Sequence, residues 1–465
     1  MGRTNTSKRG RLAKPVVHFS ETTLTSYAGA MPLLQFLNER LELPQLLGIA
    51  VPTTGRARRY PVHLVLYAFL VGSLMGVAKM AHLEWLRGDA VLEKFARLAA
   101  WPGRKVFSHA LEYVTDSGVV AITGLLSNFG LRSIAGHSSV VLDFDSTALR
   151  CFGLQEKAAF GYCGKGRNRR RHHPLVGSVA QTRAVINAKY RDGSGIDEQE
   201  TIGFIRETVK RARDAMAGRQ VSVRGDSGFW SKAVGAWLLE QAITFTFAMP
   251  LSPALKLMLM KVTFTPVDVP EPWITVGEEG EEDDPTDEIE VGVLDGASLG
   301  YDARLRIIVI RRRVADPKAP PPGKVVGWSP DWRYQAIITD RDWEPLDVWR
   351  FYNDRGDCER VFKFGKHALG LGWFVSHVFR ANEVAFLLRL LAWNSDLLFQ
   401  QDAELRAHRE GRPVVRMGVQ ARQQYLYRQA GRLLRANNRW ELRLAANRRA
   451  AATWAFYAGP DTSSA

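Results

Sequence analysis

The chain is poor in cysteine and has no uninterrupted apolar run long enough for a membrane span. It has 465 residues, and its three cysteines, Cys151, Cys163 and Cys358, are not spaced as metal-ligand pairs. A disulfide framework is therefore not expected, and free thiols fit a reducing cytosol. The longest apolar stretch, residues 61–81, contains a histidine, two glycines and a lysine. We expect it to form a buried helix and expect no membrane partner.

A secretory leader is also missing from the given sequence. Residues 1–14 (MGRTNTSKRGRLAK) are basic and polar and lack the apolar centre of a signal peptide. The sequence therefore predicts a cytoplasmic protein whose first residues form a basic arm.

Positive charge is in excess. The chain has 63 Lys and Arg against 48 Asp and Glu, which gives a net charge of +15 and an isoelectric point near 9.8. Such a balance favours a polyanionic partner, and double-stranded DNA is the natural candidate. The alternative is a generally basic surface with no specific partner.

Hydrophobic periodicity divides the chain into five regions. Helical patterns dominate the N-terminal region, strands alternate with helices in the middle, and the last region is helical and rich in arginine. This layout predicts an α/β core, with an all-α N-terminal domain for DNA binding or dimerisation. The expected parts are an N-terminal domain (1–136), a first core part (137–249), a β-rich insertion (250–333), a second core part (334–400) and a basic helical C-terminal region (401–465).

Three acids stand near the ends of predicted core elements. Asp145 follows the strand-like run SSVVLDF, Asp226 follows VSVRG, and Glu359 lies on a predicted helix after the last core strand. Strand ends gather at one edge of a sheet, so these acids can converge although they are far apart in sequence. Three carboxylates would repel one another unless cations held them. Oxygen ligands without His or Cys spacing favour Mg²⁺ or Mn²⁺, two ions per site, over zinc.

Asp143 is an alternative to Asp145 as the first acid. The two residues are two positions apart, so their side chains share one face of the strand. Asp145 is preferred because it is nearer the strand end, where a metal ion can reach it, but the sequence leaves the choice open.

Glu359 belongs to a regularly spaced set of four residues. Tyr352, Arg355, Glu359 and Lys366 fall within about 60° of one another at about 100° per residue of helix. The spacing predicts one stripe on one helix, with a carboxylate among a phenol and two cations. Such a set suits a metal-dependent site acting on a DNA phosphate.

The order of these motifs resembles the DDE transposases of bacterial insertion sequences with a Tyr-Arg-Glu-Lys signature. Asp145 begins the run DSTALRCFGLQEKAAFGYCGKGRNRRRHHPL, which is similar to the thirteen-eighty insertion-sequence family, and RGDSGFW around Asp226 matches its second acidic block. The resemblance covers roughly residues 138–400. It implies an RNase H-like core interrupted by the β-rich insertion. It also implies a bacterial, nucleoid-associated enzyme.

The resemblance also implies roles for individual residues. Asp145, Asp226 and Glu359 would bind the catalytic metals, and Tyr352, Arg355 and Lys366 would hold phosphates at the transposon end. Arginine can bind phosphate in bidentate fashion, whereas lysine acts as a point charge. Such enzymes cut DNA at terminal inverted repeats by hydrolysis and join the 3′-hydroxyl to target DNA by transesterification. Two ends require two active sites, so a homodimer is expected.

Further DNA contacts are expected outside this centre. Trp332 and Tyr334, just before the last core strand, could stack on a flipped base; the alternative is that they pack the insertion on the core. A basic loop between strands could contact the DNA backbone or simply be solvated. Its candidate residues are Lys165, Arg167, Arg169, Arg170 and Arg171.

Three functions remain compatible with the sequence. The leading prediction is an active transposase. A transposase-derived protein that binds DNA without cutting it is the second, and an RNase H-fold nuclease without strand transfer is the third. The intact set of three acids argues against the second.

Overall fold

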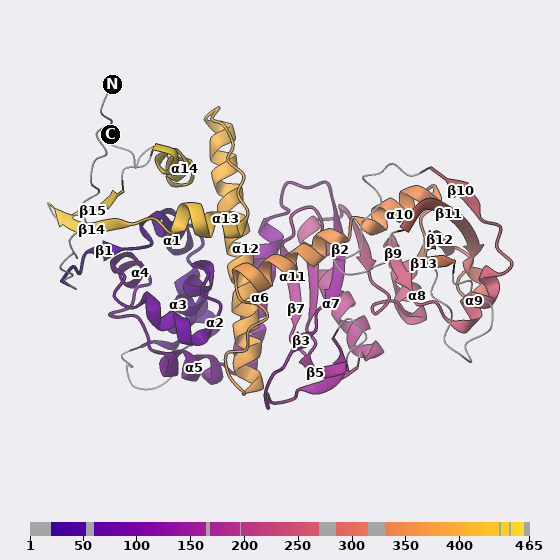
Figure 1. The fold of residues 1–465 in the computed structure, drawn as a ribbon, viewed down its shortest axis with the longest axis horizontal. Coiled ribbons are helices and arrows are strands. Elements are labelled where there is room, and N and C mark those ends of the chain that lie inside the picture. Colours follow the sequence, from indigo (N-terminus) through magenta and orange to yellow (C-terminus); the bar gives the residue numbers. More distant parts are fainter. Residues whose placement is uncertain are drawn as a thin grey trace, which may run out of the picture.

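Two bodies lie side by side along the longest axis of the molecule (Figure 1). One is helical and combines the first and last parts of the chain, and the other is built on a large sheet from the middle of the chain. The computed structural model describes residues 20–52, 60–163, 168–195, 197–268, 285–314, 331–436, 439–445 and 448–459.

The large sheet has nine strands in the order β10-β11-β12-β13-β9-β8-β2-β6-β7. β2 and β6 are antiparallel, as are β6 and β7, whereas β2, β8 and β9 run parallel to one another. The strands are β2 (Ser139–Ser146), β6 (Leu175–Val179), β7 (Val185–Lys189), β8 (Gln220–Gly225), β9 (Phe245–Met249), β10 (Thr265–Val267), β11 (Pro285–Asp295), β12 (Arg306–Val314) and β13 (Trp332–Thr339). The sequence prediction of a mixed α/β protein is confirmed.

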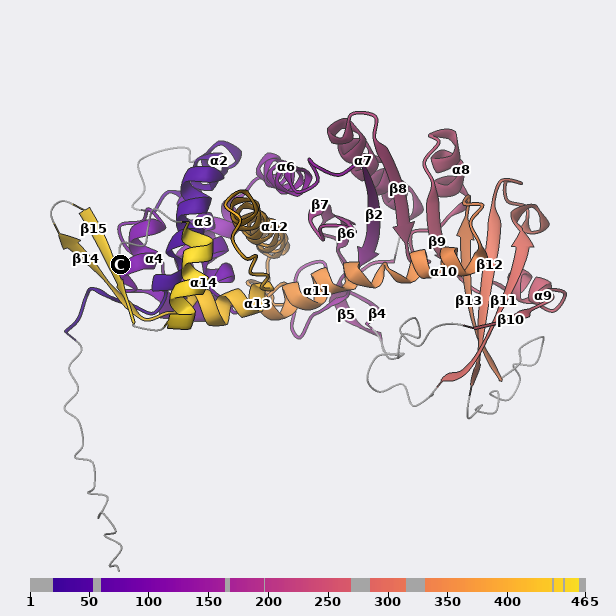
Figure 2. The ribbon, with the colours of Figure 1, turned by 90° about the horizontal axis from the view of Figure 1, so that it is seen from above.

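Alternation along β2 decides which layer covers each face of the sheet. Leu142 and Phe144 belong to the apolar core that contains residues of α7 (Glu198–Met216) and α8 (Lys232–Glu240). Asp143 and Asp145 point to the other face because successive strand residues alternate. On that face lie α10 (Pro345–Asn353) and α11 (Gly356–Ala368), which follow one another along the sheet edge (Figure 2).

The insertion extends the same sheet instead of forming one of its own among the described residues. β13 pairs with β9 in antiparallel fashion, and Ala336 is the partner of Met249 at the end of β9. The first residues of β13 therefore reach beyond the end of β9, on the side where β2, β8 and β9 all end. Figure 2 shows the insertion strands projecting past these strand ends. Within the expected insertion, residues 269–284 and 315–330 lie outside the described residues.

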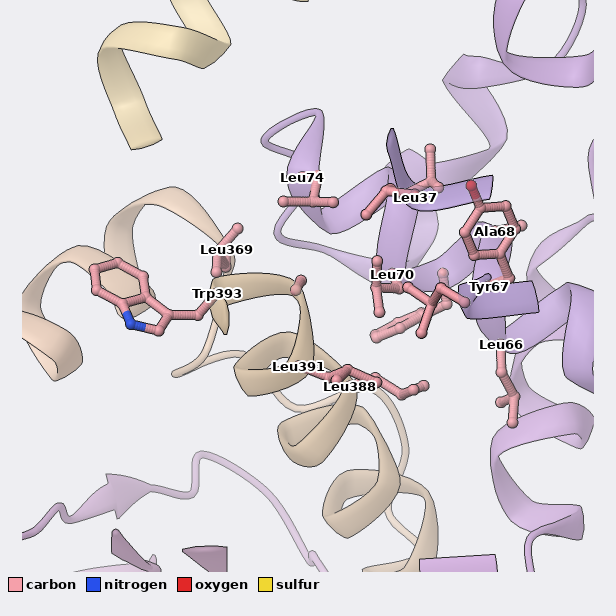
Figure 3. Packing of buried hydrophobic residues seen from close by; sticks show 14 of the residues in the cluster. Leu37, Leu66, Tyr67, Ala68, Leu70, Leu74, Leu369, Leu388, Leu391 and Trp393 are labelled. Atoms are coloured by element: carbon pink, nitrogen blue, oxygen red, sulfur yellow. The ribbon is translucent and has the colours of Figure 1, made fainter. Parts of the chain in front are cut away.

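The helical body is held together by one long helix. α12 (Phe379–Arg409) has 31 residues and packs against α3 (Val62–Leu74), α5 (Arg104–Tyr113) and α6 (Asp116–Arg132). Leu388 and Leu391 of α12 face the α3 side chains in a continuous apolar cluster (Figure 3). The N-terminal helices thus need the C-terminal part of the chain to bury their apolar faces.

A buried amide joins this body to the sheet. Asn394 of α12 accepts a hydrogen bond from the backbone N–H of Val185 at 2.9 Å and donates to the carbonyls of Leu126 and Val185 at 2.9 and 2.6 Å. Val185 begins the edge strand β7, and Leu126 lies on α6. Because a buried amide is costly unless all its bonds are made, this contact fixes α12 and α6 against the edge of the sheet.

The C-terminal region differs from the expected helical one. It contains α13 (Val419–Arg422) and α14 (Arg448–Ala458), but also a hairpin of β14 (Gly431–Ala436) and β15 (Arg439–Leu444). β14 pairs further with the short strand β1 (Leu24–Thr25), so the expected all-α N-terminal domain also contributes a strand. The sequence prediction was wrong here because polar and apolar residues alternate along β15 (Arg439–Leu444), a pattern of period two that favours strands.

In the part of the chain that the structure describes, no single helix has the length and hydropathy of a membrane span. α5 and α6 reach those values only as a pair, across a bend of 96°.

Candidate active site

Asp145 and Asp226 lie at the same edge of the sheet, on neighbouring parallel strands. Phe144 of β2 is the register partner of Gly225 of β8, so each acid follows directly after a paired residue. Adjacent strands are about 4.8 Å apart, and the two acid-bearing backbones are therefore next to each other. The expectation that strand ends would bring distant acids to one edge holds for this pair.

Local backbone contacts orient both carboxylates. One Asp145 oxygen accepts the backbone N–H of Ser146 at 2.8 Å, and the Asp145 side chain is 11% exposed. Asp226 Oδ1 accepts the N–H of Gly228 at 2.9 Å, and the Asp226 carbonyl accepts the N–H of Phe229 at 3.1 Å. The sequence after Asp226 therefore forms a tight turn that caps β8 and holds the carboxylate half-buried at the sheet edge.

Asp143, the alternative first acid, is fully buried in an ion pair. Arg224 on β8 binds both of its oxygens, with Nε to Oδ1 at 2.7 Å and Nη2 to Oδ2 at 2.9 Å. Arg224 also donates to the backbone carbonyl of Phe351 at the end of α10. A carboxylate at 0% exposure with both oxygens bound by one guanidinium is suited to holding elements together, and Asp145 is the better candidate for a metal ligand.

The predicted helical stripe is divided between two helices. α10 ends at Asn353 and α11 begins at Gly356, and Arg355 stands between them as the residue before α11. The N–H of Arg355 donates to the carbonyl of Tyr352 at 3.0 Å, three residues back, which tightens the chain at the junction. The expected single helix over 352–366 is therefore wrong in this detail, although both segments have helical backbone.

Arg355 reaches the strand end. Its Nη1 lies 3.6 Å from Oδ2 of Asp145, and its guanidinium lies 5.8 Å from the ring centroid of Tyr352. The Arg355 guanidinium thus lies beside the Asp145 carboxylate, and its phosphate contact stays a prediction.

Lys366 also lies at this strand end. Its Nζ donates to the hydroxyl of Thr147 at 2.7 Å, two residues after Asp145. Burial lowers the pKa of Lys366 below its usual value, and the negative charge of Asp145 works in the opposite direction. The side chain is half-buried.

Tyr352 has a different environment. Its side chain is 7% exposed and belongs to an apolar cluster with Trp349 of α10 and Ile308 of β12. The structure therefore places its ring in the packing between α10 and the insertion strands, and its predicted phosphate contact stays a prediction.

Position 359 lies on α11 between the two residues that reach β2. Relative to Arg355 it is turned by about 40°, and relative to Lys366 by about 20°, so all three backbone positions share one face of the helix. α11 packs against β2. The side chain of Glu359 lies outside the described residues, and its meeting with the two aspartates stays a prediction.

The donor set fits a hard divalent cation. Among the described side chains, no group of three His, Cys, Asp or Glu residues is assembled that could hold a metal ion. Asp145 and Asp226 supply carboxylate oxygens on adjacent strands, and such oxygens are the preferred ligands of Mg²⁺ and Mn²⁺. The glutamate expected to complete the set is the one whose side chain is not described.

The two candidate stacking aromatics lie inside β13, not before it. Trp332 pairs across the ladder with Arg313, and the Arg311 guanidinium lies 4.3 Å from its ring centroid. Tyr334 contacts Phe264 edge to face at 6.1 Å. Both are partly exposed and lie on the part of β13 that projects past the strand ends. Packing of the insertion and a DNA contact both remain open for them.

The predicted basic loop divides into exposed and buried arginines. Arg169 and Arg170 are exposed on β5 (Asn168–His172), whereas Arg171 is 8% exposed and donates to the carbonyl of Tyr162. Arg171 is thus a support of the sheet and is poorly placed to contact DNA. Lys165 and Arg167 lie outside the described residues.

Sequence reasoning missed two residues at this site. Arg224 stands two positions before Asp226, and Thr147 two positions after Asp145. An arginine inside an otherwise apolar strand, with an aspartate in a second buried strand, is a signal for a buried ion pair. Nothing in the sequence singles out Thr147 as a partner of Lys366.

The fold and this site define a mixed α/β protein whose acids gather at the ends of parallel strands. The family model described as Transposase DDE domain group 1 matches residues 10–455 of the chain. The chain therefore belongs to this family of DDE transposases, which are enzymes that cleave and join DNA.

Comparisons with individual proteins give weaker likenesses. A piggyBac transposase synaptic complex with hairpin DNA is similar with a TM-score of 0.45 and 12% identity, covering 86% of this chain and 79% of that chain. A Drosophila P element transposase strand transfer complex is similar with a TM-score of 0.23 and 14% identity, covering 44% and 43% of the two chains. No curated protein matches the chain.

Proposed function

We propose that this transposase cuts DNA at the terminal inverted repeats of its own insertion sequence and joins the freed 3′-hydroxyl ends to target DNA. The observation that carries the proposal is the pairing of Phe144 with Gly225, which sets Asp145 beside Asp226 at one sheet edge. Arg355, directly before α11, and Lys366 of α11 reach the same edge. Within the family, the Tyr-Arg-Glu-Lys spacing favours membership of the thirteen-eighty insertion-sequence group.

We propose an RNase H-like core for the central part of the chain. Its support is the order β7-β6-β2-β8-β9, with an antiparallel β2–β6–β7 meander and the parallel strands β8 and β9 on the other side of β2. In such a core the first acid lies on the central strand and the second at the end of its parallel neighbour. Asp145 on β2 and Asp226 after β8 would take these two places.

Two Mg²⁺ or Mn²⁺ ions would be held by Asp145, Asp226 and Glu359. When bound, these ions would activate a water or a 3′-hydroxyl and would stabilise the leaving oxygen. Arg355 beside Asp145 would bind a non-bridging phosphate oxygen and fix the scissile group at the sheet edge. Lys366 would add a second positive charge, held in place by Thr147. Tyr352, packed under the α10–α11 junction, would orient Arg355 through its ring.

The rest of the molecule supplies surfaces for a large anionic substrate. A net charge of +15 supports binding of double-stranded DNA. Arg169 and Arg170 of the loop, together with Lys165 and Arg167, would contact its backbone, and Trp332 or Tyr334 would stack on a base. Two ends must be cut together, so we propose a homodimer.

A cleavage assay tests this function. The substrate is the DNA that flanks the reading frame, which should contain short inverted repeats, and the readout is strand cutting in Mg²⁺ followed by joining to a target plasmid. Asp145→Asn, Asp226→Asn and Glu359→Gln should each abolish cutting while end binding persists; Asp302→Asn, an exposed acid paired with Arg304, is the matched control. Full activity of an active-site variant would refute its metal role, and cutting without joining would indicate a nuclease.

A further inference from the structure

A second, smaller sheet lies at the same sheet edge as the candidate active site. It has three strands in the order β3-β5-β4, with β3 (Leu149–Arg150), β4 (Ala159–Tyr162) and β5. β3 begins three residues after the end of β2, and β5 leads into β6, whose Leu175 is the partner of Ser146. Leu175 lies five positions after Arg170, so the two are at most about 18 Å apart. The small sheet therefore lies next to Asp145.

One part of this sheet exposes aromatic rings to solvent. Phe160 is 70% exposed and Tyr162 is 59% exposed, and as residues two apart on β4 they share one face. The preceding segment exposes Phe152 and Leu154 at 82% and 84%. Among the described residues, four of the sixteen large exposed apolar side chains fall within residues 152–162. Such a concentration on a folded protein marks a binding surface.

Arginines border these rings. Arg170 is the cross-strand partner of Phe160, and its guanidinium lies 5.7 Å from the Phe160 ring centroid. Arg150 lies 4.6 Å from the ring centroid of Phe152. Within the described chain, neither Arg169 nor Arg170 forms an ion pair with a carboxylate. The positive charge beside the rings is therefore available to an anionic ligand.

Contacts of β5 hold the small sheet in place. Arg171 packs against Gly161, where a Cβ atom would come within 2.4 Å of the guanidinium, and donates to the Tyr162 carbonyl. On His172, Nδ1 is hydrogen-bonded to the Tyr190 hydroxyl at 2.7 Å and Nε2 to the backbone carbonyl of Glu156 at 2.9 Å. These contacts hold β4 and β5 in place before any ligand binds, so the exposed rings are presented on a fixed surface.

We propose that the face of Phe160, Tyr162 and Arg170 binds unpaired nucleotides of the DNA strand that leaves the active site. Intact duplex presents phosphates but hides its base faces, so backbone binding needs arginines and gains nothing from exposed rings. Unpaired bases stack on aromatic side chains while nearby arginines hold the phosphates. This inference rests on the proposed function for the identity of the strand, because cutting near a transposon end frees single-stranded nucleotides at this sheet edge.

The test compares binding of an unpaired strand and of a duplex. Fluorescence anisotropy is measured with a 20-nucleotide poly-dT strand and with a mixed-sequence duplex of equal length, for the full chain and for Phe160→Ala/Tyr162→Ala. We expect the double variant to bind the single strand at least ~10-fold more weakly and the duplex within ~3-fold of the unchanged protein. Phe160→Trp should retain single-strand affinity, and Tyr425→Ala, which removes a ring exposed at 67% on another part of the surface, should change neither.

Several outcomes would overturn the proposal. Equal losses of affinity for the single strand and for the duplex would mean that this surface contacts only the DNA backbone. Unchanged affinity of the double variant for the single strand would refute the proposal. So would a lack of single-strand binding by the unchanged protein. If the double variant instead abolishes self-association in size-exclusion chromatography, or binding to anionic vesicles, another occupant covers the rings. Equal melting temperatures exclude misfolding. Asp226→Asn should bind the single strand normally, so failure of cleavage and failure of this surface are distinguishable.

Discussion

Arg224 and Asp143 form a bidentate ion pair between the two strands that carry the candidate catalytic aspartates. The guanidinium binds both carboxylate oxygens at 2.7 and 2.9 Å, and its third nitrogen donates to the carbonyl of Phe351. One buried side chain thus fixes β2, β8 and the end of α10 in relation to one another. Since α11 follows α10 after two residues, this contact sets where the signature helix meets the acids.

Breaking this pair should destabilise the fold strongly. Arg224→Met leaves the Asp143 carboxylate buried without its partner, and we expect a loss of about 3–5 kcal/mol in the free energy of unfolding. Thermal unfolding measures the effect. Arg304→Met, which breaks the exposed pair with Asp302, is the control and should leave the free energy of unfolding nearly unchanged.

The double variant Asp143→Leu/Arg224→Met should recover part of that stability, because no buried charge remains uncompensated. Unchanged melting of Arg224→Met would show that the pair does not hold the strands together.

Lys366 should matter for cleavage more than for folding. Lys366→Met keeps the apolar part of the side chain but removes the charge, and we expect end cleavage to fall roughly 10- to 100-fold, as for a hydrogen bond to a charged group. Lys363→Met, on an exposed position of the same helix, should cleave normally. Steady-state cleavage rates on end DNA decide between these outcomes.

The lowered pKa of Lys366 gives this prediction a pH dependence. The charge, and with it the phosphate contact, should be lost as pH rises, beginning below 10.5, the usual pKa of lysine. Cleavage by Lys366→Met should lack this decline. A normal rate in this variant would count against a phosphate role.

Binding of duplex DNA should weaken steeply with salt. Each phosphate neutralised by an arginine releases counterions, which contributes about −0.9 to the slope of log K against log salt concentration. Arg169→Ala/Arg170→Ala should therefore reduce the slope by about 2 at similar thermal stability. Anisotropy titrations between low and high salt measure the slope. An identical slope would mean that these two arginines do not touch the DNA backbone.

His173 should make the protein sensitive to mild acid. Burial, together with the charges of Arg171 and Arg191, lowers the pKa of His173 to about 4 in the folded state, against about 6.5 in an unfolded chain. Between these values the unfolded state binds a proton that the folded state does not, so stability falls as pH falls from about 6.5 to about 4. Melting temperatures across this window measure it.

His173→Gln should flatten that part of the pH profile, whereas His408→Gln, at an exposed position, should follow the unchanged protein. If His173→Gln shows the full acid sensitivity, another group is responsible.

Local sequence patterns predicted much of the core. The strands that end near Asp145 and Asp226 lie where the sequence pattern places them. The neighbour relation of β2 and β8 could not be derived, because 74 residues separate Ser146 from Gln220 and strand order depends on packing. The expectation of convergence came instead from the rule that strand ends gather at one edge of a sheet, and the resemblance to a known family agreed with it.

Other features depend on tertiary contacts that a linear pattern does not contain. Tyr352 fits a helical stripe with Arg355, yet its ring is buried because α10 packs on the insertion strands. The hairpin β14–β15 was missed although Asn437 and Asn438, residues typical of tight turns, stand between its strands. The high arginine content suggested a basic helix and masked the period-two alternation.

Cleavage of the polypeptide by bound iron tests directly whether the three acids meet. Fe²⁺ takes the place of Mg²⁺, and with ascorbate and peroxide it generates radicals that cut the backbone near the ion. The account predicts fragments that end close to Asp145, Asp226 and Glu359, in the presence of end DNA, and their loss in Asp226→Asn. Cuts at only one of these positions, or at none of them, would contradict a shared metal site.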